Sequence, residues 1–328
     1  NVKRNRAPTV TQRTRAVEIG FAFFCFPKSR RAVTEHFAPT LFYVEKNEFF
    51  IFRLYHKNSA LPNEKQTLTR REKNSILKYV KKKSVILSVC AIVLFLIVIA
   101  LQFVDVNVFG NDIYDGYLKT IFVYCACVPL CFILLSFSGY GVFNKPRKIY
   151  CFLVALVISI NNFPFSAYFK GVSYVTNKNA VYAAVFVANC FLTAAFEELL
   201  FRGLLFNALC ESSPKTVKGV LRAIIISSVI FGAAHFLNLF GGAAFLPTLA
   251  QAGYTSLIGA LCAFVLFKTH NIIFPWLVHA VYNVGGLILT REGLGNGVVF
   301  DTTTIVVTVI LGVLVGIFAL VSMIIWRN

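Results

Sequence analysis

The segment AVYAAVFVANCFLTAAFEELLFRGLLFNALC, residues 180–210, decides the fold class of this chain. A helix needs about 20 mostly apolar residues to cross a bilayer, and this segment is longer than that. It nevertheless contains Glu197, Glu198 and Arg202. Because a charge at the bilayer centre costs about 2.5–3.5 kcal/mol on insertion scales, the three side chains cannot face lipid. We therefore predict a helical bundle whose interior takes them up.

The composition of the whole chain is that of a multi-spanning membrane protein. Of its 328 residues, 57% are hydrophobic and 14% are charged, against about 45–50% and 25% in soluble domains. The mean hydropathy of +0.71 agrees with this. We expect an all-α, polytopic fold with about eight transmembrane helices. The expected spans are Ser84–Val104, Leu118–Phe137, Ile149–Tyr168, Ala180–Cys210, Val220–Phe240, Thr248–Phe267, Ile272–Leu289 and Thr304–Trp326.

The formal net charge of +18 is concentrated in the N-terminal flank. Residues 1–83 hold 19 of the 32 Lys and Arg but 6 of the 14 Asp and Glu. Basic residues beside a membrane are attracted to its anionic surface, so the expected partner of this charge is a lipid bilayer and not a nucleic acid. Basic clusters also recur on alternate loops, which predicts both termini in the cytoplasm. We expect a bacterial cytoplasmic membrane, since no organelle-targeting signal is evident.

Two regions follow from these patterns. Residues 1–83 are expected to be a basic extension, disordered or not native to the folded domain, because residues 1–70 show no helical or strand period. Residues 84–328 are expected to form the transmembrane domain. The nine Cys fall mostly in apolar runs without metal-ligand spacing, so we interpret them as packing residues.

Two glutamates and an arginine form the first group that could carry chemistry. Glu198 and Arg202 are four residues apart, share a helix face and can pair. Glu197 points about 100° away from Glu198. A purely structural ion pair would explain Glu198 and Arg202 but not a second carboxylate. We therefore predict that Arg202 orients Glu198 while Glu197 stays available for a reaction.

Two further predicted spans each contain a histidine. His235 follows small residues in FGAAH, which lets another helix approach closely. A lone histidine on an apolar helix is more often a satisfied packing residue. His279 is accompanied by Asn283 on the same helix face, which is harder to explain by packing alone.

The depth of these residues in the bilayer indicates whether they can meet. At 1.5 Å per residue, Glu197 lies about 21 Å from its basic loop, His235 about 20 Å, His279 about 16 Å and Asn283 about 22 Å. All four thus fall within about one helical turn of the same level. Three separate helices are expected to form one site.

The chemistry of such a site points to hydrolysis. A carboxylate can act as a general base on water, a neighbouring histidine can share that water or protonate a leaving amine, and a histidine with an asparagine can stabilise an oxyanion. Alternatively Glu197, His235 and His279 could bind a divalent metal such as zinc with one position open for water. Nucleophilic catalysis by Ser or Cys is disfavoured because neither histidine has an obvious partner of that kind.

The three motifs resemble those of the CPBP family of intramembrane proteases, also called the ABI or CAAX-protease family. The family pattern of Glu-Glu-x-x-x-Arg, Phe-x-x-x-His and His-x-x-x-Asn has its counterparts in Glu197-Glu198…Arg202, Phe231…His235 and His279…Asn283. The resemblance covers residues 149–290. It implies a helical bundle like that of the Ras-converting CAAX endopeptidases.

The resemblance also implies an activity and a role for each residue. The expected reaction is hydrolysis of a peptide bond in a membrane-associated peptide, prenylated or hydrophobic, with Glu197 and His235 activating water and His279 and Asn283 stabilising the oxyanion. The family is named for metalloproteases, but a metal-free mechanism is also proposed for it. The main alternative is a catalytically silent scaffold or bacteriocin self-immunity protein on the same fold. A proton-coupled transporter is the least favoured alternative. It would need charged residues along a path across the bilayer, whereas here they lie at one depth.

Overall fold

The computed structural model describes residues 44–45, 48–49, 70–102, 104, 110, 112–169, 179–291, 293–295 and 302–325. Two short antiparallel strands, β1 (Val44–Glu45) and β2 (Glu48–Phe49), pair with each other. The rest of the described chain is helical or connects helices, which confirms the predicted all-α membrane fold.

The helices follow one another along the chain with two changes of helix type. A π-helical segment, η1, continues α5 without a break, and a 3-10 segment, η2, continues α7. The elements are α1 (Arg70–Gln102), α2 (Asp112–Ser138), α3 (Tyr150–Asn161), α4 (Phe165–Phe169), α5 (Ala180–Glu198), η1 (Leu199–Phe206), α6 (Asn207–Ser212), α7 (Val217–Ala234), η2 (His235–Gly241), α8 (Phe245–Thr269), α9 (Ile273–Leu287) and α10 (Thr302–Ile325).

Eight apolar helical segments of the described chain correspond to the eight predicted spans. Five are long and apolar enough to cross a membrane, and three are shorter apolar helices. The longer ones are Ile113–Ser138, Ala180–Ser212, Val217–Gly241, Phe245–Thr269 and Ile305–Ile325, and the shorter ones are Val85–Leu101, Tyr150–Asn161 and Ile273–Leu287.

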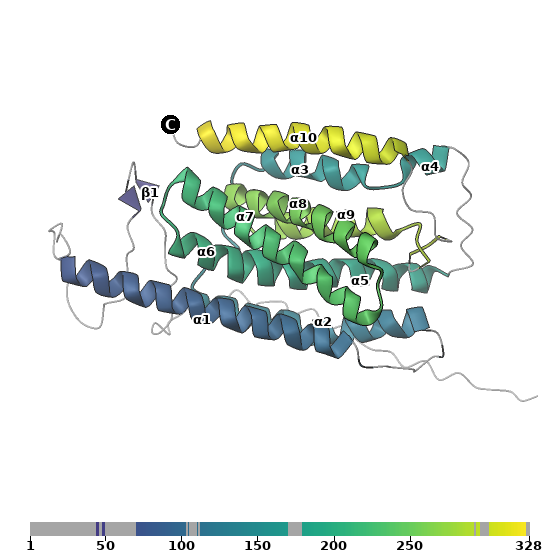
Figure 1. Cartoon of the computed structure of the whole chain (residues 1–328), viewed down its shortest axis with the longest axis horizontal. Helices are drawn as coiled ribbons and strands as arrows, with labels where there is room; N and C mark the ends of the chain where they lie inside the picture. The colour runs from purple at the N-terminus through teal and green to yellow at the C-terminus, as the bar shows by residue number, and fades with distance from the viewer. Residues whose placement is uncertain are drawn as a thin grey trace, which may run out of the picture. The chain divides into compact units, whose positions relative to one another are not determined.

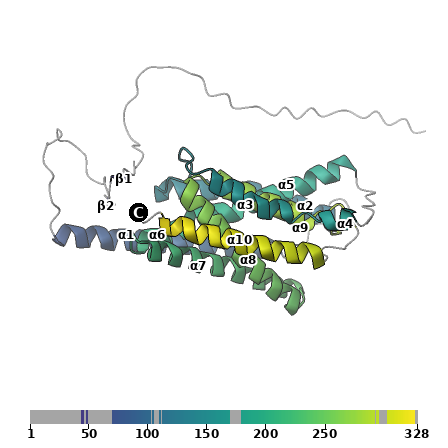
Figure 2. The ribbon, with the colours of Figure 1, turned by 90° about the horizontal axis from the view of Figure 1, so that it is seen from above.

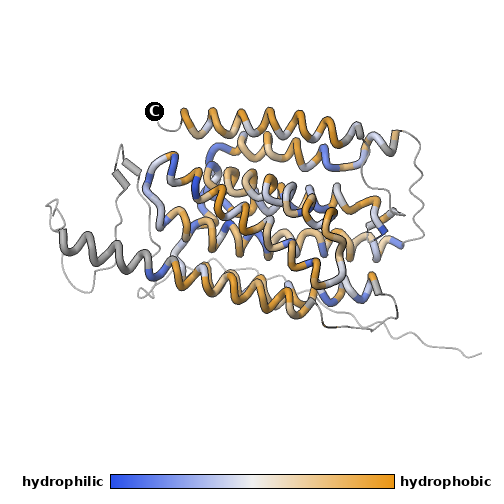
Figure 3. Tube along the Cα trace, viewed as in Figure 1, coloured by the Kyte–Doolittle hydropathy of each residue, from blue (hydrophilic) through white to orange (hydrophobic). Residues whose placement is uncertain are grey.

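The helices lie side by side, with α5, α7, α8 and α9 between α3 and α10 on one side and α1 and α2 on the other (Figure 1). The view from above shows α7 and α8 along one edge of the bundle (Figure 2). Helix α10 packs on α3, α3 packs on α8 and α9, α9 packs on α5, and α5 packs on α2. The outer helix α10 is apolar almost throughout (Figure 3) and leaves side chains such as Val309 and Ile324 exposed. Since hydrocarbon solvates such side chains as well as a protein core does, these outer faces are suited to contact lipid.

The first helix begins earlier than predicted. Helix α1 starts at Arg70, whereas the first span was expected to begin at Ser84. The apolar part, Val85–Leu101, agrees with the prediction. The preceding turns are rich in Arg, Glu and Lys, which are good helix formers, so the helix extends beyond its apolar part. Apart from these turns and the two short strands, the predicted extension 1–83 lies outside the described residues.

The third predicted span, 149–168, is not one helix. Helix α3 ends at Asn161, and the short α4 begins at Phe165, directly after Pro164. Proline lacks an amide hydrogen and cannot continue a helix normally. The Asn162 side chain donates to the Tyr282 carbonyl oxygen at 2.7 Å, so the break is tied to α9.

Two other predicted spans differ from regular helices at the residues of interest. The fourth is continuous from Ala180 to Ser212 but is π-helical over Leu199–Phe206. In the fifth predicted span, α7 ends its α-helical part at Ala234, so His235 opens η2 instead of lying within an α-helix. Gly242, with φ 86°, ends that segment in the left-handed conformation that glycine adopts without strain.

Helices α7 and α8 approach each other closely at one glycine. A Cβ atom added to Gly232 would overlap the Ser256 hydroxyl and the Ala252 carbonyl oxygen of α8. Small residues at such crossings are typical of membrane helix pairs. This close contact sets the distance at which α7 presents its C-terminal end to the interior.

We predict that Gly232→Ala pushes α7 and α8 apart and lowers the free energy of unfolding by about 1–3 kcal/mol, the usual cost of overpacking. Thermal unfolding in detergent measures this. Gly253→Ala is the matched control, because a Cβ on Gly253 would meet nothing within 4 Å. An equal effect of both substitutions would contradict the close packing at Gly232.

Candidate active site

The last turn of α5 delivers two carboxylates with different environments. The Glu198 side chain is completely buried, at 0% exposure, whereas the Glu197 side chain is 15% exposed. Arg202, 1% exposed, pairs with Glu198 through Nη1 and Oε1 at 3.1 Å. Glu198 and Arg202 thus form the ion pair that their four-residue spacing predicts. Glu197 is left as the carboxylate that a substrate or water can reach.

The π-helical segment η1 begins immediately after these carboxylates and includes Arg202. π-Helical turns are rare and occur mostly at functional sites. They displace backbone carbonyls from their α-helical donors, and here Asn207 compensates. Its Nδ2 atom donates to the carbonyl oxygens of Arg202 at 3.1 Å and Gly203 at 2.9 Å.

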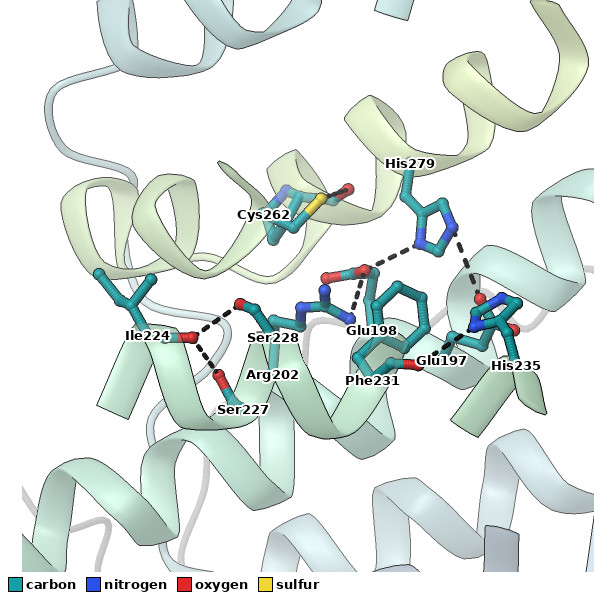
Figure 4. A network of polar contacts seen from close by, with 11 residues as sticks. Glu197, Glu198, Arg202, Ile224, Ser227, Ser228, Phe231, His235, Cys262 and His279 are labelled. Carbon is teal, nitrogen blue, oxygen red and sulfur yellow. Dashed lines mark hydrogen bonds and ion pairs between the residues drawn. The ribbon is translucent and has the colours of Figure 1, made fainter. Parts of the chain in front are cut away.

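His279 of α9 contacts both carboxylates (Figure 4). Its Nδ1 atom lies 2.8 Å from Glu198 Oε1, and its Nε2 atom lies 3.5 Å from Glu197 Oε2. The ring is almost fully buried. An imidazolium has a donor on each nitrogen, so a protonated His279 together with Arg202 would balance the two negative charges. The predicted meeting of α5 and α9 at one depth is confirmed by these contacts.

Phe231 of α7 is the apolar centre of the site. The Arg202 guanidinium carbon lies 4.3 Å from its ring centroid, a cation–π contact. The rings of His235 and His279 both meet it edge to face, with centroids at 5.2 and 5.7 Å. Phe231 therefore brings the two histidines and the buried arginine around one ring.

His235 is oriented by the backbone of its own helix. Its Nδ1 atom lies 3.1 Å from the Phe231 carbonyl oxygen. Since a carbonyl oxygen only accepts, Nδ1 must carry the hydrogen in this bond, and Nε2 then presents a lone pair. Among the described residues no hydrogen bond or ion pair joins His235 to Glu197. The predicted contact of these two through one water stays a prediction.

Helix α9 is held in place by polar contacts from neighbouring helices. Ser159 of α3 donates to the Val278 carbonyl oxygen at 2.7 Å, and Trp276 donates its indole hydrogen to the Phe191 carbonyl oxygen of α5 at 2.8 Å. Both contacts lie within one turn of His279. Asn283 lies one turn further along and is half-buried, and it has no hydrogen-bond partner among the described residues.

The metal alternative of Glu197, His235 and His279 finds no support in this arrangement. Within the described ranges, no group of three or more His, Cys, Asp or Glu side chains is placed so that it could hold an ion. His279 directs both ring nitrogens toward carboxylates. In this arrangement Glu197, His235 and His279 do not form a three-ligand metal site.

Several features of the site were not predicted from the sequence. The π-helical turns have no clear sequence signal. Gly259 of α8 also went unnoticed, although a Cβ there would lie 2.6 Å from Arg202 Nη2 and 3.1 Å from Phe231 Cδ1. A glycine inside a span is a signal of close approach, and it could have indicated the space reserved for the guanidinium.

Fold and site define a polytopic helical membrane protein with a carboxylate–histidine cluster inside its bundle. Residues 179–285 match the family model described as type II CAAX prenyl endopeptidase Rce1-like. The resemblance inferred from the motifs is thereby confirmed, and the matched range includes all six candidate residues. No curated protein and no solved structure matches the chain.

We predict that the two glutamates differ in their importance for stability. Glu198→Gln leaves the Arg202 charge buried without its partner and should lower the free energy of unfolding by about 3–5 kcal/mol. Glu197→Gln removes the longer contact between a partly exposed carboxylate and His279. It should lower the free energy of unfolding by about 1 kcal/mol. Thermal unfolding of both variants in detergent measures the difference, and equal losses would be evidence against distinct roles.

Proposed function

We propose that this protein is an intramembrane endopeptidase that hydrolyses a peptide bond of a membrane-associated substrate by means of a water molecule activated by Glu197 and His235. The observation that supports this most is the unequal pair of carboxylates. Glu198 is buried and held by Arg202, while the adjacent Glu197 is partly exposed beside His279. A structural ion pair alone would need only one carboxylate.

The proposed reaction begins with proton transfer from water. Glu197 accepts a proton from water as the water oxygen forms a bond to the carbonyl carbon of the substrate, and the carbonyl π electrons move onto oxygen. His235 assists with the lone pair of Nε2, which its Nδ1 hydrogen bond leaves free. The tetrahedral intermediate then expels the amine, which takes up the proton that Glu197 accepted.

The oxyanion of this intermediate needs positive or hydrogen-bonding groups nearby. His279, fixed by Glu198 through Nδ1, supplies such a group, and Asn283 supplies an amide on the same face of α9. Arg202 then acts as a positioning residue, because it holds Glu198, which in turn holds His279. The roles of His279 and Asn283 in this proposal are those that the family resemblance implies.

The proposed substrate is a hydrophobic or prenylated peptide. The family model carries the description of a CAAX prenyl endopeptidase, and the apolar surroundings of the site suit a substrate that partitions into the bilayer. For the orientation, the alternation of basic loops supports both termini on the cytoplasmic side. The competing proposal, a silent scaffold or immunity protein on this fold, predicts that Glu197 can be replaced without consequence.

We predict that Glu197→Gln abolishes cleavage without unfolding the protein. The purified chain is offered quenched fluorescent peptides, one farnesylated and one apolar without a prenyl group. Loss of general-base catalysis should lower kcat/KM by about 10²–10⁴-fold. Glu211→Gln is the matched control, because Glu211 accepts a hydrogen bond from Tyr140 outside the site and should leave cleavage unchanged. Equal cleavage by all three proteins would rule out the assignment of Glu197.

We predict that cleavage persists after exhaustive treatment with a chelator, since the described histidines and carboxylates do not form a three-ligand site. The measurement compares initial rates before and after chelation and determines bound zinc by elemental analysis. Loss of activity that added zinc restores would overturn the metal-free mechanism while leaving Glu197 as a candidate.

A further inference from the structure

A second cavity lies at the end of the bundle where α2, α6 and α8 end and α7 and α9 begin. Its volume is about 130 Å³, room for several waters or for one group of the size of a phosphate. It is separate from the carboxylate–histidine site. Its walls are formed by Gly141, Val142, Phe206, Asn207, Cys210, Lys215, Val220, Leu266, Phe267 and His270.

The cavity has an apolar floor and a polar mouth. Phe206, Val220 and Leu266 are buried at its base. Lys215 and His270 stand at its rim, where Lys215 Nζ donates a hydrogen bond to the Cys210 carbonyl oxygen at 2.9 Å. A cavity of this kind offers charged groups to an anion while its interior favours hydrocarbon.

Lys215 is the cationic side chain of the rim, and Arg147 and Lys148 lie close enough to His270 to act on its ring. Partial burial lowers the pKa of His270, and the charges of Arg147 and Lys148 lower it further, so the neutral ring is favoured and the positive potential comes from the neighbouring cations. Burial also lowers the pKa of Lys215, although Glu211 acts in the opposite direction. Glu211 does not line the cavity, and it is engaged by Tyr140 and Lys83. An anion entering the cavity would thus meet a positive potential.

One residue of this rim, and one residue of the loop bonded next to it, are held in an unfavourable backbone conformation. Lys148 and His270 have φ values of 44° and 56°, the left-handed region that residues other than glycine rarely adopt. The Arg147 amide donates to the Thr269 carbonyl oxygen at 3.0 Å, which ties the loop of Lys148 to the end of α8. Strained residues persist where their surroundings fix them, and they cluster at ligand sites.

We propose that this cavity binds the phosphate group of an anionic membrane lipid. The basic rim recognises the phosphate, and the apolar floor accepts the adjoining part of the lipid. The floor favours a lipid over free phosphate, since inorganic phosphate would gain nothing from Phe206, Val220 and Leu266. The position at the helix ends is where a lipid headgroup lies when these helices cross a bilayer. The site is independent of the proposed proteolytic activity.

The test measures lipid binding to the full chain in detergent by native mass spectrometry. Phosphatidylglycerol should bind as a distinct tight adduct, and phosphatidylcholine should not. Lys215→Gln should weaken the adduct about fivefold, the effect of about one interfacial charge. His270→Asn should weaken it by less, because the neutral ring supplies a hydrogen bond and not a charge. Asparagine is chosen at 270 because it tolerates the left-handed conformation.

Lys218→Gln is the matched control, because Lys218 lies three residues after Lys215 in the chain, is exposed and does not line the cavity. It should bind phosphatidylglycerol like the wild type. Equal weakening in Lys218→Gln would show general charge attraction and overturn the proposal, as would equal binding of phosphatidylcholine. Full displacement of the lipid by 10-fold excess inorganic phosphate would identify a free-anion site instead. If thermal unfolding shows that His270→Asn is not folded, the proposal is tested by comparing the binding of phosphatidylglycerol to Lys215→Gln with its binding to Lys218→Gln.

Discussion

Arg202 carries a permanent positive charge into the centre of an apolar bundle, where neither lipid nor core can solvate it. Much of the surrounding packing follows from this charge. Glu198 is buried beside it, Phe231 places its ring against the guanidinium, and Gly259 leaves the space that the guanidinium occupies. Such a pair adds little net stability but is costly to break. Once Glu198 is fixed in this way, it can hold His279.

The same constraint explains what the sequence could and could not predict. Charges in an apolar segment must face inward, so a helical bundle, the pairing of Glu198 with Arg202 and the approach of α9 were all predictable from composition and spacing. The break at Pro164 was predictable only as a local irregularity. The contact of His279 with both carboxylates was not, because spacing along one helix says nothing about the rotation of another. The start of α1 at Arg70 was missed because hydropathy marks the apolar part of a helix and not its full length.

The two candidate sites occupy different places along one continuous helical run. Glu197 and Glu198 lie at the end of α5, and Phe206 and Asn207 line the cavity at the end where the loops are basic. Asn207 lines the cavity, and its side chain also donates a hydrogen bond to the carbonyl oxygen of Arg202 in the carboxylate–histidine site. The described chain thus has one polar cluster in the interior of the bundle and another beside its loops.

The π-helical segment between these two places has a consequence for how the chain can vary in length. An α-helical residue turns the helix by about 100°, and a π-helical turn contains more residues than an α-helical one. The length of Leu199–Phe206 therefore sets how α6 is rotated relative to α5, and loss of one residue there would change that rotation. Asn207 would then no longer face the carbonyl groups it supports. Substitutions within this stretch keep the two faces aligned, whereas insertions and deletions do not. The number of residues from Glu198 to Asn207 is therefore constrained in addition to the identities of Glu198, Arg202 and Asn207.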